Sequence, residues 1–173
     1  MIVKKPVKVY GLSTLRVGEE MEEYARSLGA ELYGVASAEA YAREFPDKPQ
    51  PTRFIAEAKS VIVLGLPFSR GTMDTVLRPE LANLRQQASE EVISRAQPVG
   101  AERFFLAEEN TALKEELQLM AYRLARRLEP QGWRALVIPN KQDPRFKTAP
   151  FYFMPAMYLA GLGTLGLNCC IIT

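Results

Sequence analysis

The sequence predicts an α/β (α+β) domain built on a single mixed sheet that is flanked by helices. Residues 60–66 (Ser-Val-Ile-Val-Leu-Gly-Leu) form a short, continuous and partly β-branched apolar run, which is typical of a buried strand. Residues 108–128 repeat apolar side chains at three- and four-residue spacings, which is typical of an amphipathic helix. Because further helical and strand patterns alternate along the chain, one sheet with helices packed on it is favoured.

The first half of the chain supplies the expected central strand and the elements that lead to it. Gly29 marks the end of an amphipathic helix, and three prolines between residues 46 and 51 indicate an extended linker. The expected elements are, in order, a helix over 18–28, a strand over 31–36, a short helix over 54–58, the buried strand over 60–66 and a loop over 67–74.

The second half is expected to end in a helix, a glycine turn and a strand. Residues 77–107 carry helical patches over 79–93 and fit either a lid or arm, or a helical hairpin without a functional role. The remaining expected elements are a helix over 108–128, a strand over 133–139, a polar loop over 140–149, an apolar helix opened by Pro155, and a short buried strand over 169–173.

Composition narrows the function classes. The chain has 173 residues, 47% hydrophobic and 24% charged, with a net charge of +2, so it fits one globular domain and gives no compositional support for nucleic-acid binding. It contains no apolar run long enough to span a membrane, and its start does not resemble a signal peptide. The two cysteines are adjacent, Cys169 and Cys170, and predict buried small hydrophobes in a reducing, cytoplasmic location.

The complete absence of histidine excludes several chemistries. Histidine is the commonest general base and the commonest metal ligand, and the chain has none. Catalytic arrangements that need it, such as Ser-His-Asp and Cys-His, are therefore excluded. Two adjacent cysteines do not make a tetrahedral metal site, so the sequence predicts no metal site of its own.

The most informative stretch is residues 160–173, Ala-Gly-Leu-Gly-Thr-Leu-Gly-Leu-Asn-Cys-Cys-Ile-Ile-Thr. Gly161, Gly163 and Gly166 match the G-x-G-x-x-G spacing of dinucleotide-binding proteins. That motif binds a pyrophosphate only when it follows a strand and opens a helix. Here the expected order is helix, turn and strand, so the dinucleotide-binding interpretation is rejected.

This stretch resembles the A-G-L-G-x-x-G-x-N segment of the superfamily of epoxyqueuosine reductases and corrinoid reductive dehalogenases. That family continues with a hydrophobic strand ending in Ile-Thr. The matching positions are Ala160, Gly161, Leu162, Gly163, Gly166, Asn168, Ile171, Ile172 and Thr173. The pattern of helix, strand, linker and V-I-V-L-G-x-P strand in the first half is also similar to that family, so the resemblance covers most of the chain in outline.

The resemblance implies a cobalamin-binding domain related to the nitroreductase fold, with FMN as the alternative cofactor. A ferredoxin-like domain with two 4Fe-4S clusters normally follows it, and supplies the electrons of an oxidoreductase. The residues implied in cofactor binding are Thr148, Ala160, Gly161, Leu162, Gly163, Thr164, Gly166 and Asn168. A homodimer is also compatible with the resemblance, because nitroreductase-type proteins hold flavin between subunits.

The chain departs from the family at its charged positions. Lys147 stands where the epoxyqueuosine reductases carry the aspartate thought to donate a proton, and Phe153 and Leu167 replace a glutamate and a lysine. Lys147 would be a proton donor only with a lowered pKa. Tyr152 and Tyr158 are the other candidate acids, and each is also suited to packing among aromatic residues. We therefore expect no reduction of epoxyqueuosine.

The cysteine count leaves two hypotheses open. Iron–sulfur clusters need about four cysteine ligands each, and the chain holds two cysteines in all. A reductase would need the polypeptide to continue past Thr173 into an iron–sulfur domain, which we expect, or would need a separate ferredoxin-like protein. The alternative is a degenerate, non-catalytic binding or scaffold domain that kept the fold and lost the chemistry.

Overall fold

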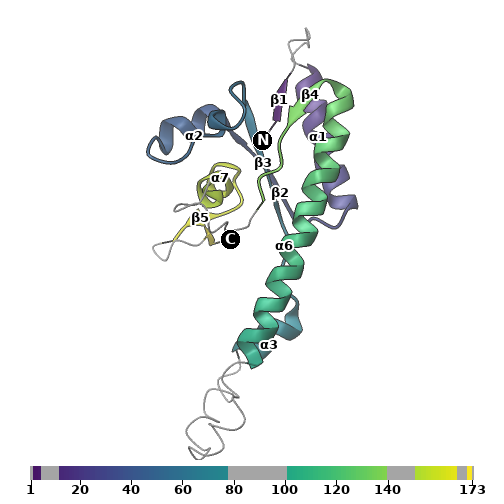
Figure 1. Cartoon of the computed structure of the whole chain (residues 1–173), viewed down its shortest axis with the longest axis vertical. Coiled ribbons are helices and arrows are strands. Elements are labelled where there is room, and N and C mark those ends of the chain that lie inside the picture. Colours follow the sequence, from purple (N-terminus) through teal and green to yellow (C-terminus); the bar gives the residue numbers. More distant parts are fainter. Residues whose placement is uncertain (1, 5–11, 78–100, 140–150, 167–170, 173) are drawn as a thin grey trace, which may run out of the picture. The chain divides into compact units, whose positions relative to one another are not determined.

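A computed structural model describes the chain in five stretches, residues 2–4, 12–77, 101–139, 151–166 and 171–172 (Figure 1). The chain forms two compact units, one made of residues 1–66 and 117–173 and the other of residues 67–116. The helix α6 (Ala101–Leu128) contributes its first part to the second unit and its last part to the first. The two units are described separately below.

The first unit contains both sheets. Its elements are β1 (Ile2–Lys4), α1 (Leu12–Ser27), β2 (Leu32–Ser37), α2 (Ala38–Glu44), the 3₁₀ turn η1 (Pro51–Arg53), β3 (Ser60–Gly65), the end of α6, the 3₁₀ turn η3 (Glu129–Gln131), β4 (Trp133–Ala135), α7 (Phe153–Leu159), β5 (Thr164–Leu165) and β6 (Ile171–Ile172).

The main sheet has four strands in the order β2-β3-β1-β4, and every pairing within it is antiparallel. The longest ladder joins β2 to β3 over six residue pairs, from Leu32 opposite Gly65 to Ser37 opposite Ser60. A second, two-stranded sheet pairs β5 with β6. The α+β class is thus confirmed, whereas the expectation of a single mixed sheet is wrong. The connection between the strands expected over 31–36 and 60–66 reverses the direction of the chain. The two strands therefore pair antiparallel.

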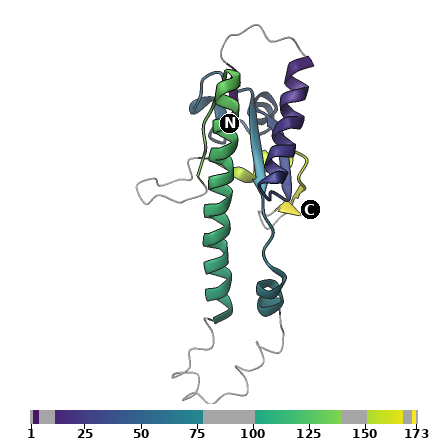
Figure 2. The ribbon, with the colours of Figure 1, turned by 90° about the vertical axis from the view of Figure 1, so that its right-hand side faces the viewer.

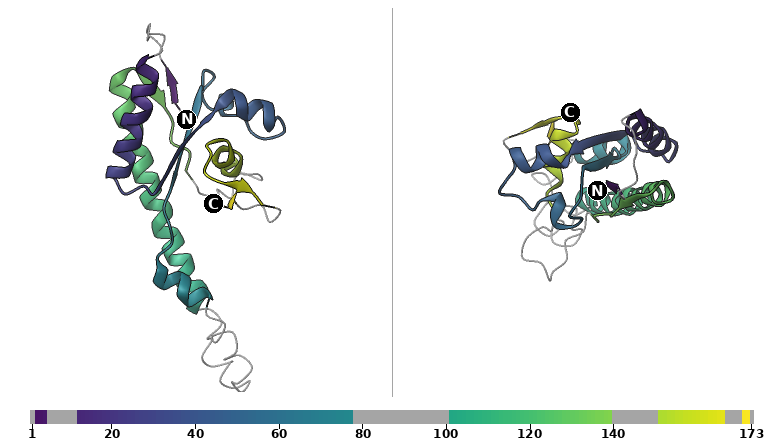
Figure 3. Two further views of the ribbon diagram at one scale, coloured as in Figure 1. Left: turned by 180° about the vertical axis from the view of Figure 1, so that it is seen from behind. Right: turned by 90° about the horizontal axis from the view of Figure 1, so that it is seen from above.

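The strand β3 lies at the centre of the first unit and is covered on both faces. Val61 and Val63 belong to one hydrophobic cluster, and Ile62 and Leu64 pack against another. Successive side chains of a strand point to opposite faces, so a strand covered on both sides is apolar at nearly every position. Figure 3, seen from above, shows the resulting layers, with α1 and α6 on one side of the strands and α2 and α7 on the other.

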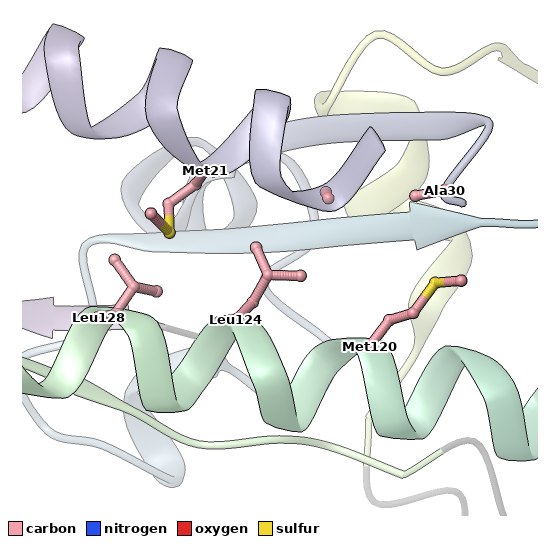
Figure 4. Packing of buried hydrophobic residues seen from close by; sticks show 6 residues of the cluster. Met21, Ala30, Met120, Leu124 and Leu128 are labelled. Carbon is pink, nitrogen blue, oxygen red and sulfur yellow. The ribbon is translucent and has the colours of Figure 1, made fainter. Parts of the chain in front are cut away.

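Two helices cover the first face of the sheet. Met21 and Ala25 of α1 and Met120, Leu124 and Leu128 of α6 are all buried in one cluster. Figure 2 shows the two helices beside the strands, and Figure 4 shows the α6 side chains projecting towards Met21 and Ala30. Residues spaced by four positions lie on one face of a helix, so this periodicity in the sequence predicted the buried faces correctly.

Charged residues join the same two helices at their surface. Arg127 of α6 forms an ion pair with Glu20 of α1 at 3.0 Å, and its guanidinium lies 5.4 Å from the ring centre of Tyr24. Both ionised side chains are about half exposed, so the pair contributes at most about 1 kcal/mol to stability. The arginines at the end of α6 thus include one that orients the packing of α1 on α6.

The second face of the sheet is covered by α2, α7 and the residues that lead into α7. Tyr41, Phe151 and Ala156 are fully or almost fully buried there, together with Ala36 and Val61. Ser37 caps α2, because its hydroxyl oxygen accepts a hydrogen bond from the Ala40 amide at 3.3 Å. This cap turns the chain sharply from β2 into α2, and so places Tyr41 over the sheet.

Gly34 of β2 lies close to Ala160, the residue that follows α7. A Cβ atom at this position would lie 2.8 Å from the carbonyl oxygen of Ala160 and 2.9 Å from its Cβ. Real Cβ atoms do not approach other atoms so closely, so a side chain at residue 34 would push the end of α7 away. Glycine in the middle of a strand often marks such a close approach.

The second unit contains α3 (Arg70–Leu77) and the beginning of α6. Ser69 caps α3, since its hydroxyl oxygen accepts a hydrogen bond from the Thr72 amide at 3.3 Å. The Glu109 carboxylate of α6 accepts hydrogen bonds from the Ser69 amide and, at 3.1 Å, from the Ser69 hydroxyl. Hydrogen bonding by the Thr72 hydroxyl, followed by that of the Ser69 amide and hydroxyl, lowers the pKa of Glu109.

Several element boundaries differ from those expected. The helices expected over 18–28 and 108–128 begin earlier, at Leu12 and Ala101. The expected loop over 67–74 instead contains the start of α3, because Ser69 supplies a cap. The expectation of a helix over 54–58 is wrong, because residues 54–57 form turns and a bend after the 3₁₀ turn Pro51–Arg53. The strand β4 stops at Ala135 because its partner β1 spans only three residues. The helical patches over 79–93 lie outside the described residues.

Replacing Gly34 by alanine should destabilise the protein by about 1–3 kcal/mol, the usual cost of forcing an extra methyl group into packed structure. The added Cβ would meet the backbone of Ala160, which cannot rotate away. Urea unfolding measures the change. Gly18→Ala is the matched control, because no described residue lies within 4 Å of a Cβ at that helical position, and alanine is favoured over glycine there by about 0.5–1 kcal/mol. Equal effects of both variants would contradict the close approach.

Acidification should release the contact between Glu109 and Ser69. A carboxyl whose pKa is lower in the folded than in the unfolded chain stabilises the folded form at pH values above its ordinary pKa of 4.5. This stabilisation is lost as the pH falls through the lower pKa of the folded state. The Ser69 amide resonance, followed by NMR during an acid titration, should therefore shift with a midpoint below 4.5. Glu109→Gln should abolish this titration and Glu108→Gln should preserve it. A midpoint at or above the ordinary value would show that the contact is absent in solution.

Candidate functional site

The glycine turn follows α7 directly, as the sequence predicted. The Gly161 amide donates to the carbonyl of Tyr158 at 3.0 Å, and the Leu162 amide donates to the carbonyl of Met157 at 3.0 Å. Gly161 has a φ of 73°. This pattern of hydrogen bonds around a left-handed residue is the Schellman motif that ends many helices. Helix termination is therefore one sufficient reason for glycine at position 161.

The two sides of this turn have different surroundings. Its inner side packs on the sheet, where Ala160 and Leu162 approach Gly34. On its outer side Gly161 is exposed, and within the described part of the chain nothing lies within 4 Å of a Cβ placed there. Thr164 and Leu165 are exposed as well. As far as the described residues show, the outer side of the turn around Gly161, Thr164 and Leu165 is accessible to a ligand.

Not all of the predicted site residues are placed. The structure places Ala160, Gly161, Leu162 and Gly163 in the turn, Thr164 in β5 and Gly166 directly after β5. Lys147, Thr148 and Asn168 lie outside the described residues, as do Cys169 and Cys170. The order of helix, turn and strand is confirmed, since β6 (Ile171–Ile172) pairs with β5.

The candidate acid Tyr158 lies in α7 beside the turn. Its side chain is 40% exposed, and its ring meets Phe45 edge-on at a centroid distance of 6.3 Å. Edge-on contact with Phe45 fixes the ring on one side and leaves the other side accessible. Of the two candidate tyrosines, this one lies closer in the sequence to the turn and is the more suitable proton donor for a molecule bound there.

The second candidate, Tyr152, is tied to α2 by its backbone. Its carbonyl oxygen accepts a hydrogen bond from the Tyr41 hydroxyl at 3.2 Å, and the Lys48 Nζ atom lies 5.2 Å from the centre of its ring. A lysine ammonium at that distance from an aromatic face is attracted by about 0.5–1 kcal/mol at an exposed site. Tyr152 is thus held by a residue on each side.

Gln50 shapes the loop that carries Lys48. Its side-chain nitrogen donates to the carbonyl oxygens of Phe45 at 2.8 Å and of Lys48 at 2.7 Å. These two bonds fold the loop after α2 back on itself, and this folding positions the lysine over Tyr152. Neither Gln50 nor Lys48 has a sequence signal that would have indicated this role, because both depend on contacts formed only in the folded chain.

An aromatic cluster lies beneath both candidate tyrosines. Tyr41 stacks on Phe151 at 5.3 Å, and Phe151 meets Phe54 at 6.3 Å and Phe153 at 5.7 Å, both edge-on. Burial, and to a smaller extent the nearby Tyr152, raises the pKa of Tyr41 to about 12. Tyr41 therefore stays protonated at neutral pH, where its hydroxyl is a hydrogen-bond donor and not a base.

Replacing Tyr41 by phenylalanine should lower the free energy of unfolding by about 1 kcal/mol, the usual effect of losing one buried hydrogen bond.

The stability of the wild-type protein should also fall as pH rises from 10 towards 12. In that interval the unfolded chain ionises its tyrosines, while Tyr41 and Tyr33, whose pKa burial also raises to about 12, keep their protons in the folded state. Denaturant unfolding at a series of alkaline pH values measures both effects.

The half-exposed Tyr158 supplies the control for this experiment. Tyr158→Phe should leave the stability nearly unchanged, and its spectrophotometric titration should keep the high-pH ionisation that Tyr41 contributes. Tyr41→Phe should lose that contribution. Identical titration curves for the two variants would contradict the buried position of Tyr41.

Comparison with protein-family models gives no match for this chain, and comparisons with curated proteins and with solved structures give none either. Among the residues that the structure describes, no group of three or more metal-ligating side chains is found. No helix in those same stretches is long and apolar enough to cross a membrane. The site is thus defined by the chain's own geometry, with the exposed side of the glycine turn and Tyr158 as its central features.

Proposed function

We propose that this chain is a corrinoid-binding domain of an iron–sulfur-dependent reductase, with FMN as the alternative cofactor. The observation that carries the proposal is the exposed outer side of the glycine turn, in a segment that matches the family at nine positions between Ala160 and Thr173. Because Gly161 and Gly163 lack side chains, a flat cofactor can approach their backbone closely. The outer side of Gly161 leaves room for such an approach.

The residues that would hold the cofactor are those of the turn. The backbone of residues 161–164 would face the ring, and the exposed Thr164 hydroxyl would offer one hydrogen-bond partner. When bound, a corrinoid supplies the electron-transfer chemistry that no side chain of this sequence supplies. Tyr158, which is half exposed next to the turn, would donate a proton to a substrate held there.

The proposal requires an external source of electrons. The chain has two cysteines, and an iron–sulfur cluster needs about four thiolate ligands. A ferredoxin-like domain or a separate ferredoxin-like protein would therefore complete the reductase, in a reducing cytoplasmic setting. Lys147, in place of the acid of the epoxyqueuosine reductases, argues against epoxyqueuosine as the substrate.

A non-catalytic scaffold of the same fold is the second candidate function. Two observations favour it, since helix termination accounts for Gly161 and close packing on Gly34 accounts for the small residue Ala160. A domain that keeps these contacts keeps its fold whether or not it binds a cofactor. Cofactor binding by the purified protein separates the two functions.

Titration with hydroxocobalamin should give saturable binding, and replacing Gly161 by asparagine should weaken it by tenfold or more, about 1.4 kcal/mol. Asparagine tolerates the left-handed conformation better than most residues, so the turn should survive. Its side chain would occupy the space over the turn. Absorption spectroscopy of the bound corrinoid, with a parallel titration of FMN, measures the affinity.

Gly132→Asn is the matched control. Gly132 is also left-handed, with a φ of 87°, and nothing within the described stretches lies within 4 Å of a Cβ there. It follows η3 and is not part of the turn. Equal weakening by both variants would point to a general loss of folding. If neither cofactor binds the wild-type protein below about 1 mM, where the binding free energy is only about 4 kcal/mol, the scaffold function replaces the reductase.

A further inference from the structure

A pocket of about 450 Å³ lies in the first unit, away from the glycine turn. It lies where η3 leads into β4, opposite the turn that follows η1, and Figure 1 shows β4 near the top of the sheet. Its lining residues are Phe54, Ile55, Glu129, Gly132, Trp133, Arg134, Ala135 and Leu136. The volume falls within the range of about 300–1,000 Å³ that is usual for small-molecule sites.

The alternation of β4 determines which side chains face this pocket. Trp133 and Ala135 pack against the cluster formed by α1 and α6, on the first face of the sheet. Neighbouring side chains of a strand point to opposite faces, so Arg134 lies on the other face. Phe54 packs on that second face as well, against Phe151. The pocket therefore combines a cationic side chain of β4 with an aromatic ring from the turn after η1.

The pocket also has an apolar body. Ile55 is buried, Phe54 is partly buried, and Leu136, the residue after β4, is 41% exposed. A ligand that covers apolar side chains in a pocket is stabilised there, because it removes their surface from water. A ligand with an apolar group would therefore be favoured over a fully polar one.

Two opposite charges line the same pocket. Glu129 and Arg134 are both exposed, and neither is joined to another side chain by an ion pair between described residues. Three other arginines of the first unit are paired, as Arg127 is with Glu20. Arg134 presents a planar fork of donors that suits a carboxylate, and Glu129 accepts hydrogen bonds from an ammonium group.

We infer that this pocket binds a small amphipathic zwitterion, with an apolar or aromatic body and both a carboxylate and an ammonium group. Arg134 receives the carboxylate, Glu129 receives the ammonium group, and Phe54 with Leu136 covers the apolar body. None of the glycine-turn residues lines the pocket. The pocket is thus independent of the proposed corrinoid site, and an experiment that refutes one of the two proposals leaves the other intact.

The probe is L-phenylalanine, which carries all three groups. Titrated into the isotope-labelled protein, it should shift the backbone amide resonances of residues 54–55 and 129–136 in a saturable manner. Phenylacetate lacks the ammonium group and phenethylamine lacks the carboxylate, so each should bind about fivefold more weakly, as expected for the loss of an exposed ion pair. Equal affinities of the three compounds would overturn the zwitterion assignment, and an absence of saturable shifts would overturn the site.

Charge-neutralising variants test the two residues separately. Arg134→Gln should weaken L-phenylalanine binding about fivefold and leave phenethylamine binding unchanged, whereas Glu129→Gln should weaken L-phenylalanine binding and spare phenylacetate. Both side chains are exposed, so the fold should be retained, which circular dichroism checks. Arg123→Gln is the control, because this exposed arginine of α6 does not line the pocket. Equal losses in all three variants would refute the assigned roles.

Discussion

The structure of the first unit depends on the burial of β3 from both sides. Val61 and Val63 pack under α2 and α7, while Ile62 and Leu64 pack under α1 and α6. A strand covered in this way keeps no solvent-facing row, so helices must be supplied on both faces. The helix pair α1–α6 and the group around Tyr41 and Phe151 are the two coverings. Each is held by apolar contact, with ion pairs such as Arg127–Glu20 only at the edge.

The position of the glycine turn follows from this layered packing. Ala36 and Val61 have small side chains on the second face of the sheet, so α7 can lie close to β2. Gly34 has no side chain, and Ala160 at the end of α7 can therefore approach its backbone. The Schellman motif at Gly161 then directs the chain away from the helix and into β5. The same residues therefore stabilise the fold on their inner side and present a glycine-rich backbone on their outer side. One structural role and one functional role are compatible here, since they use opposite sides of the turn.

The sequence predicted only those residues of the candidate site that are contiguous in the chain. Gly161, Gly163 and Thr164 are contiguous, and their pattern after an apolar helix indicated a turn with accessible backbone. The residues that position its neighbours are distant in the chain. Tyr41 reaches the Tyr152 carbonyl across 111 positions, and Lys48 reaches the Tyr152 ring from the loop after α2. No periodicity or motif marks such contacts, because they arise from the packing of separate elements. The pocket at β4 has the same origin, since Phe54 and Arg134 meet only in the folded chain.

The sequence by itself determined the central strand, the buried faces of the long helix and the order of helix, glycine turn and strand at its end. These features depend on the spacing of apolar side chains and on glycine, and both act over a few residues. It also excluded histidine chemistry outright. Only the tertiary structure decided that the strands pair antiparallel in the order β2-β3-β1-β4, that α3 begins at a serine cap, and that Gly34 lies against Ala160. Strand pairing and close approach depend on which distant segments share a face, and the local pattern of side chains is the same for several such arrangements.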